Sequence, residues 1–131
     1  MRIKWIAVDF DGTLATFKCD WPNDPNAVGE PIHAMVERVK QWIADGEDVR
    51  IFTARADCTH PKRGVIPWVE MALPIQQWCL KHLGKVLPIT NTKDYWCKAL
   101  YDDRAIQVET DTGRLIRPAL PRGHLNLGVG E

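Results

Sequence analysis

Short apolar runs alternate with amphipathic stretches along the first half of the chain. Residues 3–9 predict a buried β-strand, because the run is mostly apolar and ends in a carboxylate. Apolar positions at helical spacing behind Pro31, closed by Gly46, predict an amphipathic helix over residues 32–45. The run over residues 49–53 predicts a second short strand. We expect the first of these strands to be the central one of a sheet.

The pattern continues with a polar, proline-containing loop over residues 54–64. Residues 67–83 predict a second helix, and Pro74 within it is expected to kink the helix or split it in two. Two further strands are predicted over residues 86–89 and 97–101. Strands that alternate with helices favour an α/β fold with a mainly parallel sheet, which binds ligands at the carboxyl ends of its strands.

The pattern near the C-terminus predicts a β-hairpin, with residues 105–109 and 114–116 as its arms and a glycine-containing turn at 111–113. Residues 118–131 are rich in Pro and Gly, and we expect an extended or disordered tail there. Residues 1–117 are then expected to form a single domain. The overall expectation is a Rossmann-like three-layer sandwich with this hairpin at its C-terminal end.

Composition and charge limit the classes of partner expected for this 131-residue chain. Seventeen Lys and Arg balance seventeen Asp and Glu, so no net charge draws the protein to nucleic acid or to an anionic membrane. No apolar run reaches the roughly 20 residues that span a bilayer, and the four cysteines show no CxxC spacing. These features predict a cytoplasmic protein with reduced thiols and no membrane partner.

The candidate chemistry begins at residues 9–14, DFDGTL, directly after the first strand. Two carboxylates at positions i and i+2 repel each other unless a cation compensates them, and a hard divalent ion is the natural partner. The run resembles the DxDGT signature of the haloacid dehalogenase-like (HAD-like) superfamily of hydrolases. In that setting the motif is specific, because it directly follows the first strand.

The resemblance extends over most of the chain, because later motifs of the family occur in the same order. Thr53 at the end of a hydrophobic strand resembles the second motif, and the acidic pair Asp102 and Asp103 after residues 97–101 resembles the fourth. The spacings leave no room for a cap domain. The resemblance therefore implies a short, capless phosphatase with an open site.

The resemblance also implies a role for each residue of the site. Asp9 attacks phosphorus and forms an aspartyl-phosphate, which water then hydrolyses. Asp11 is the general acid and base. Thr53 and the backbone amides near Phe10 and Ala54 bind the phosphoryl oxygens.

The resemblance implies Mg²⁺ as the cofactor, since this ion prefers oxygen ligands and keeps several waters. Asp103 aligns with the metal-binding acid of the fourth motif, and Asp102 is expected either to lie beside the ligands without touching the ion or to be an alternative ligand. The further acid that usually follows three to five residues later is missing from residues 104–108. The implied ligands are Asp9, the backbone carbonyl of Asp11, Asp103 and Asp102.

Basic residues beside these motifs are candidates for contacts with the phosphate. Lys93, in a loop after a strand, fits the lysine of the third motif better than Lys98, which lies within a predicted strand. Arg55 and Arg104 each follow a catalytic segment directly. Each arginine is a candidate for binding the substrate's phosphate, or an ion-pair partner of the acid cluster.

Three functions remain open at this point. The leading one is a Mg²⁺-dependent phosphomonoester hydrolase acting on a phosphorylated substrate. A polynucleotide or nucleotide 3'-phosphatase is an alternative, because residues 102–104 also resemble the fourth motif of polynucleotide phosphatases, although the neutral charge disfavours a nucleic acid partner. A non-catalytic, metal-binding interaction module is the third.

Overall fold

The computed structural model describes residues 3–18, 24–60 and 64–116. By its internal contacts the chain divides after Tyr101 into two units, residues 1–101 and 102–131. The tail expected over residues 118–131 lies outside the described residues. In the described part of the chain, no helix has both the length and the apolar character needed to cross a membrane.

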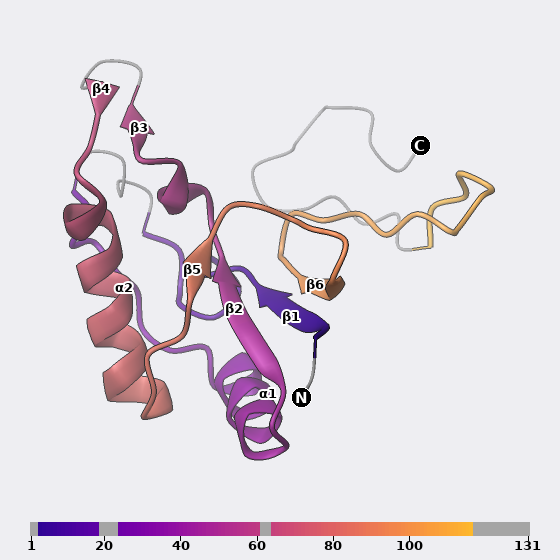
Figure 1. The fold of residues 1–131 in the computed structure, drawn as a ribbon, viewed down its shortest axis with the longest axis horizontal. Helices are drawn as coiled ribbons and strands as arrows, with labels where there is room; N and C mark the ends of the chain where they lie inside the picture. Colours follow the sequence, from indigo (N-terminus) through magenta and orange to yellow (C-terminus); the bar gives the residue numbers. More distant parts are fainter. Residues whose placement is uncertain (1–2, 19–23, 61–63, 117–131) are drawn as a thin grey trace. The chain divides into compact units, whose positions relative to one another are not determined.

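A sheet of four parallel strands organises the first unit, and its order is β5-β2-β1-β6 (Figure 1). All strand pairs run in the same direction, so the carboxyl ends of the strands share one edge. The first strand of the chain lies inside the sheet, as its uninterrupted apolar run predicts. The α/β class with a parallel sheet is confirmed. The strands are β1 (Trp5–Val8), β2 (Asp48–Phe52), β5 (Ile89–Thr90) and β6 (Cys97–Tyr101).

Helix α1 (His33–Ala44) confirms the helix expected over residues 32–45. Val36 and Val39, three residues apart on one face, are buried, whereas the opposite face is charged. The helix ends where Gly46 adopts a left-handed φ of +80°. Glycine reaches this conformation at no steric cost.

Helix α2 (Trp68–Leu83) is continuous, although it contains the buried Pro74. Pro74 therefore does not split the helix in two, because the residues on both sides of it bury apolar side chains that hold the helix against the core. Gly84 ends the helix with a left-handed φ of +77°. The buried residues of this helix are Met71, Ala72, Pro74, Ile75, Trp78, Cys79 and Leu83.

Both helices pack on the same face of the sheet. The connections β1–α1–β2 and β2–α2–β5 step in the same direction across the sheet, and right-handed crossovers then place both helices on one side. Residues of both helices join one buried cluster with Val8, Val49 and Ile51, which share a face of β1 and β2. The first unit therefore has a helical layer on one face of its sheet.

Trp5 lies on the other face of the sheet, where it contacts two charged side chains. The indole N–H of Trp5 donates to Asp94 at 2.8 Å, and the guanidinium of Arg50 lies 4.6 Å from the centre of a Trp5 ring. The hydrogen bond from Trp5 is the main cause that lowers the pKa of Asp94. The second helical layer of the expected three-layer sandwich is not seen among the described residues.

Two expectations on local structure need correction. The loop expected over residues 54–64 contains a 3₁₀ turn, η1 (Ala54–Asp57), and a short antiparallel pair, β3 (Thr59–His60) with β4 (Gly64–Val65). The strand expected over residues 86–89 is wrong in position, since β5 begins only at Ile89. Pro88 accepts a hydrogen bond from β2 but has no N–H with which to extend the ladder.

Cys79 lies in the core, where burial raises the pKa of its thiol to about 11. We expect no alkylation of Cys79 by iodoacetamide in the folded protein and full alkylation after unfolding, because the thiolate is the reactive form. Below pH 9.0, the ordinary pKa of a thiol, Cys79 is protonated in both the folded and the unfolded protein. Between this pH and about 11, only the unfolded protein loses the proton, so the free energy of unfolding falls as the pH rises. Mass spectrometry of labelled peptides, with the half-buried Cys58 for comparison, checks the labelling.

The described part of the second unit contains the turn of the expected hairpin. Val108 and Leu115 form one antiparallel bridge, and the N–H of Glu109 donates to the carbonyl of Arg114 at 2.8 Å. Asp111 and Gly113 take left-handed φ values of +65° and +81° in the turn. The arms pair at this bridge without forming regular strands.

Candidate active site

Asp9 directly follows β1, at the carboxyl edge of the sheet. Its backbone N–H donates to the carbonyl of Tyr101 at 2.9 Å, and Val8 and Tyr101 are register partners in β1 and β6. The side chain of Asp9 is half-buried, and the hydroxyl of Thr13 donates to its Oδ2 at 3.4 Å. Strand pairing therefore holds the backbone of Asp9 at this edge, and its carboxylate accepts from Thr13.

The chain turns sharply between Asp9 and Ala15. The carbonyl of Phe10 accepts hydrogen bonds from the N–H groups of Leu14 and Ala15, both at 3.0 Å, and Gly12 has a φ of +89°. The ring of Phe10 is fully buried and meets the ring of Trp78 edge-on, with 5.1 Å between centroids. The ring of Phe10 therefore cannot contact a substrate, and the contact expected from the sequence involves the backbone amide near this residue.

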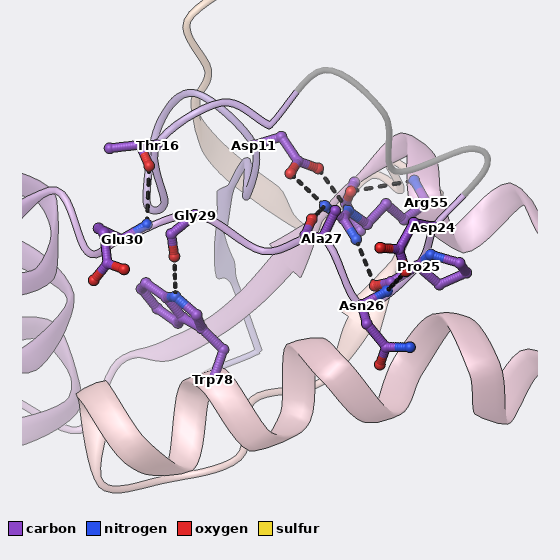
Figure 2. A network of polar contacts seen from close by, with 11 residues as sticks. Asp11, Thr16, Asp24, Pro25, Asn26, Ala27, Gly29, Glu30, Arg55 and Trp78 are labelled. Carbon is purple, nitrogen blue, oxygen red and sulfur yellow. Dashed lines mark hydrogen bonds and ion pairs between the residues drawn. The ribbon is translucent and has the colours of Figure 1, made fainter.

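Asp11 forms a bidentate ion pair with Arg55 (Figure 2). The Nε and Nη2 atoms of Arg55 donate to the two carboxylate oxygens of Asp11 at 2.8 and 2.7 Å. The same guanidinium donates to the carbonyls of Pro25, at 3.0 Å, and Ala27, at 2.7 Å. The side chain of Arg55 is fully buried and that of Asp11 is 10% exposed. Arg55 thus joins the turn after β1 to the segment of residues 25–27.

This geometry differs from the substrate clamp expected of Arg55. A guanidinium that is buried and bound to a carboxylate and two carbonyls does not present itself to a phosphate in solution. The structure instead shows the alternative, an ion pair with the acid cluster. The physical reason is that a carboxylate removed from water needs a partner of opposite charge.

Thr53 follows β2 and begins the η1 turn. It is 3% exposed, and its hydroxyl oxygen accepts a hydrogen bond from the N–H of Arg55 at 3.2 Å. Its own N–H donates to the carbonyl of Thr90 at 2.9 Å, which ties the ends of β2 and β5 together. Ala54 is exposed beside it. Thr53 therefore lies at the same edge of the sheet as Asp9 and helps to position Arg55.

The two candidate lysines lie at different ends of the strands. Lys93 is exposed in the loop that follows the carboxyl end of β5. The Nζ atom of Lys98, near the start of β6, lies 2.8 Å from the carboxylate of Glu47, which precedes β2. Lys98 is thus engaged at the amino end of the sheet, and Lys93 follows the end where the aspartates lie.

Asp102 and Asp103 are the first two residues after β6. Since Val8 pairs with Tyr101, the chain leaves β1 at Asp9 and leaves β6 at Asp102 in equivalent register positions. Within the second unit, the N–H of Arg104 donates to Asp102 at 2.7 Å, and the Arg104 side chain is exposed. Asp9, Asp102 and Asp103 are half-buried carboxylates of the kind that hold a metal ion.

Three residues that contact this site were not singled out by the sequence. Thr13 stands inside the DFDGTL run, so its place in the motif was an available signal. Pro25 and Ala27 act through their backbone carbonyls. Every residue has such a carbonyl, so no choice of residue type could have revealed these two contacts.

The segment that supplies these carbonyls is fastened to α2 and to the turn after β1. The indole N–H of Trp78 donates to the carbonyl of Gly29 at 2.8 Å, and the N–H of Glu30 donates to the hydroxyl of Thr16 at 2.9 Å (Figure 2). A side chain at position 29 would overlap the backbone of Thr16, since its Cβ would lie 1.9 Å from the Thr16 carbonyl oxygen. Glycine at this position permits the close approach.

Comparison with known proteins returned no match for the chain, whether against protein-family models, curated proteins or solved structures.

Proposed function

We propose that the protein is a Mg²⁺-dependent phosphomonoester hydrolase of the HAD-like superfamily, with Asp9 as its nucleophile. The observation that carries the proposal is the contrast between two carboxylates at the end of one strand. Asp9 is half-buried and accepts a hydrogen bond from Thr13, whereas Asp11 is buried against Arg55. Two acids in different environments suit two different roles in one reaction.

In the proposed reaction, a carboxylate oxygen of Asp9 forms a bond to phosphorus while the bond from phosphorus to the ester oxygen breaks. Asp11 delivers a proton to the leaving oxygen and then accepts one from the water that hydrolyses the aspartyl-phosphate. Thr53, Lys93 and the backbone amides near Phe10 and Ala54 neutralise the phosphoryl oxygens. The products are an alcohol and inorganic phosphate, and Asp9 is regenerated.

The residues at the ends of β1 and β6 fit a magnesium ion. Carboxylate and carbonyl oxygens are the ligands this ion prefers, and Asp9 and Asp102 leave neighbouring strands at the same edge. We assign the ligands to Asp9, the backbone carbonyl of Asp11, Asp103 and Asp102. When bound, the ion would neutralise charge on the phosphoryl group.

The same proposal includes three further features that the sequence predicts. They are a capless, Rossmann-like three-layer sandwich, a site open to bulky phosphorylated substrates, and a cytoplasmic location. The parallel sheet supports the Rossmann-like class, and the helices α1 and α2 that occupy the connections between its strands support the absence of a cap domain. The absence of CxxC spacing supports the third.

Turnover of p-nitrophenyl phosphate, with and without Mg²⁺, tests the proposed function. We expect hydrolysis that falls about 100-fold or more when EDTA removes the ion and returns when Mg²⁺ is restored, because charge neutralisation by a metal is worth several kcal/mol. A folded protein that binds Mg²⁺ in calorimetry but hydrolyses none of a panel of phosphorylated nucleotides, sugars and oligonucleotide ends is a metal-binding module. Turnover confined to oligonucleotide 3'-phosphates identifies the polynucleotide alternative.

A further inference from the structure

We infer that two copies of this chain associate through α2, with the two helices packed side by side in opposite directions. The inference does not depend on the proposed function. Its basis is the outer face of α2, which carries an exposed row of apolar side chains with a charged residue of each sign beside it.

Three large apolar side chains of α2 point away from the core. Val69, Leu73 and Leu80 are 62, 45 and 59% exposed, whereas the opposite face of the helix is buried. Together with the half-buried Gln76 they follow one another at steps of four, three and four residues. This spacing places them in one row along the helix, as in the contact row of paired helices. Single exposed apolar residues are ordinary, but a row at this spacing is typical of an interface between helices.

Two charged residues beside the row determine the direction of pairing. Glu70 lies in the first turn of α2 and Lys81 in the last, and both are exposed. They lie on the same side of the helix but roughly 16 Å apart along its axis, too far to pair within one chain. In an antiparallel pair, Glu70 of each copy lies beside Lys81 of the other, whereas a parallel pair would bring like charges together. The dipoles of the two helices favour the antiparallel pair as well.

A hollow beside the row gives the second copy room to pack. It has a volume of about 360 Å³ and lies between α2 and residues 25–26, which Figure 2 shows beside this helix. In the antiparallel pair, the last turns of one helix meet the first turns of the other, so Leu80 of the second copy approaches this hollow. The residues that line it are Pro25, Asn26, Val69, Glu70, Leu73 and Pro74.

The length of α2 limits the strength of the association. The helix has 16 residues and is therefore about 24 Å long. Stable interfaces bury about 1,200–2,000 Å² in total, and a single pair of helices of this length lies at the low end of that range. We therefore expect a reversible dimer with a dissociation constant in the micromolar range.

Sedimentation velocity of the full chain, from about 1 to 500 μM, measures the association. We expect the mass to rise with concentration from that of one chain, 14.9 kDa, toward twice that value. Leu73→Gln and Leu80→Gln should each weaken the association about tenfold or more, because each removes an apolar contact from both copies at once. The matched control is Ile3→Gln, which makes a similar change at a 60% exposed residue outside α2 and should alter the dissociation constant less than about twofold.

Charge reversal tests the antiparallel direction. Glu70→Lys and Lys81→Glu should each weaken the association about tenfold, because each turns two attractive pairs into two repulsive ones. The double variant Glu70→Lys/Lys81→Glu should return to within about threefold of wild type, since opposite charges again face each other. The two positions cannot meet within one chain, so this recovery arises only between copies. Circular dichroism of each variant checks that the helices are retained.

A chain that keeps the mass of a monomer up to about 500 μM overturns the inference and leaves this face to a different partner. Association that Leu73→Gln and Leu80→Gln leave unchanged also overturns it, because the contact then lies elsewhere. A double charge variant as weak as either single variant rejects the antiparallel pair. None of these measurements uses phosphatase activity, so a failure of the proposed function leaves the dimer standing.

Discussion

Asp9→Asn is expected to lower kcat/KM on p-nitrophenyl phosphate by at least about 10⁴-fold, because an amide oxygen is a far weaker nucleophile than a carboxylate. The fold should survive the change. Asp9 is held by its backbone N–H, which donates to Tyr101, and the asparagine side chain has nearly the same shape. Steady-state kinetics measured at saturating Mg²⁺ give the result.

The matched control for this variant is Asp111→Asn, in the turn of the second unit. Asp111 has a φ of +65°, and asparagine tolerates this left-handed conformation as well as aspartate does. The same chemical change at this position should leave activity within about twofold of wild type, in line with the small effects of surface substitutions. An Asp9→Asn protein that is folded and fully active would exclude Asp9 as the nucleophile.

Arg55→Met is expected to lower the free energy of unfolding by about 3–5 kcal/mol, because it leaves the buried carboxylate of Asp11 without its partner. The corresponding fall in the melting temperature is roughly 10 °C or more. The carbonyls of Pro25 and Ala27 lose a donor at the same time. Urea denaturation followed by tryptophan fluorescence measures the change.

Two further variants test whether the loss of the partner of Asp11 causes the fall in stability. In Asp11→Asn/Arg55→Met, both charges are removed, so we expect part of the lost stability to return. Arg50→Met, whose ion pair with Asp48 is partly exposed, should cost no more than about 1 kcal/mol. Equal losses for Arg50→Met and Arg55→Met would show that burial of the Arg55 pair adds nothing.

Much of the sheet could be predicted because its signals are local. The apolar run of β1, the helical spacing of α1 and the run of β6 each lie within a few consecutive residues. The second helix was also recognisable, but whether Pro74 would break it was not. That outcome depends on the apolar contacts that Ile75, Trp78 and Leu83 make with residues far away in the chain.

By itself, the sequence determined that two carboxylates stand at the end of a buried strand and that an acidic pair ends another. Residue type and spacing carry this information directly, and the parallel sheet brings strand ends to one edge. Only the tertiary structure decided that Asp11 pairs with Arg55, 44 residues further along the chain, and that the carbonyls of Pro25 and Ala27 complete the contact. The pairing depends on which groups folding removes from water together, and neither charge pattern nor spacing encodes that choice.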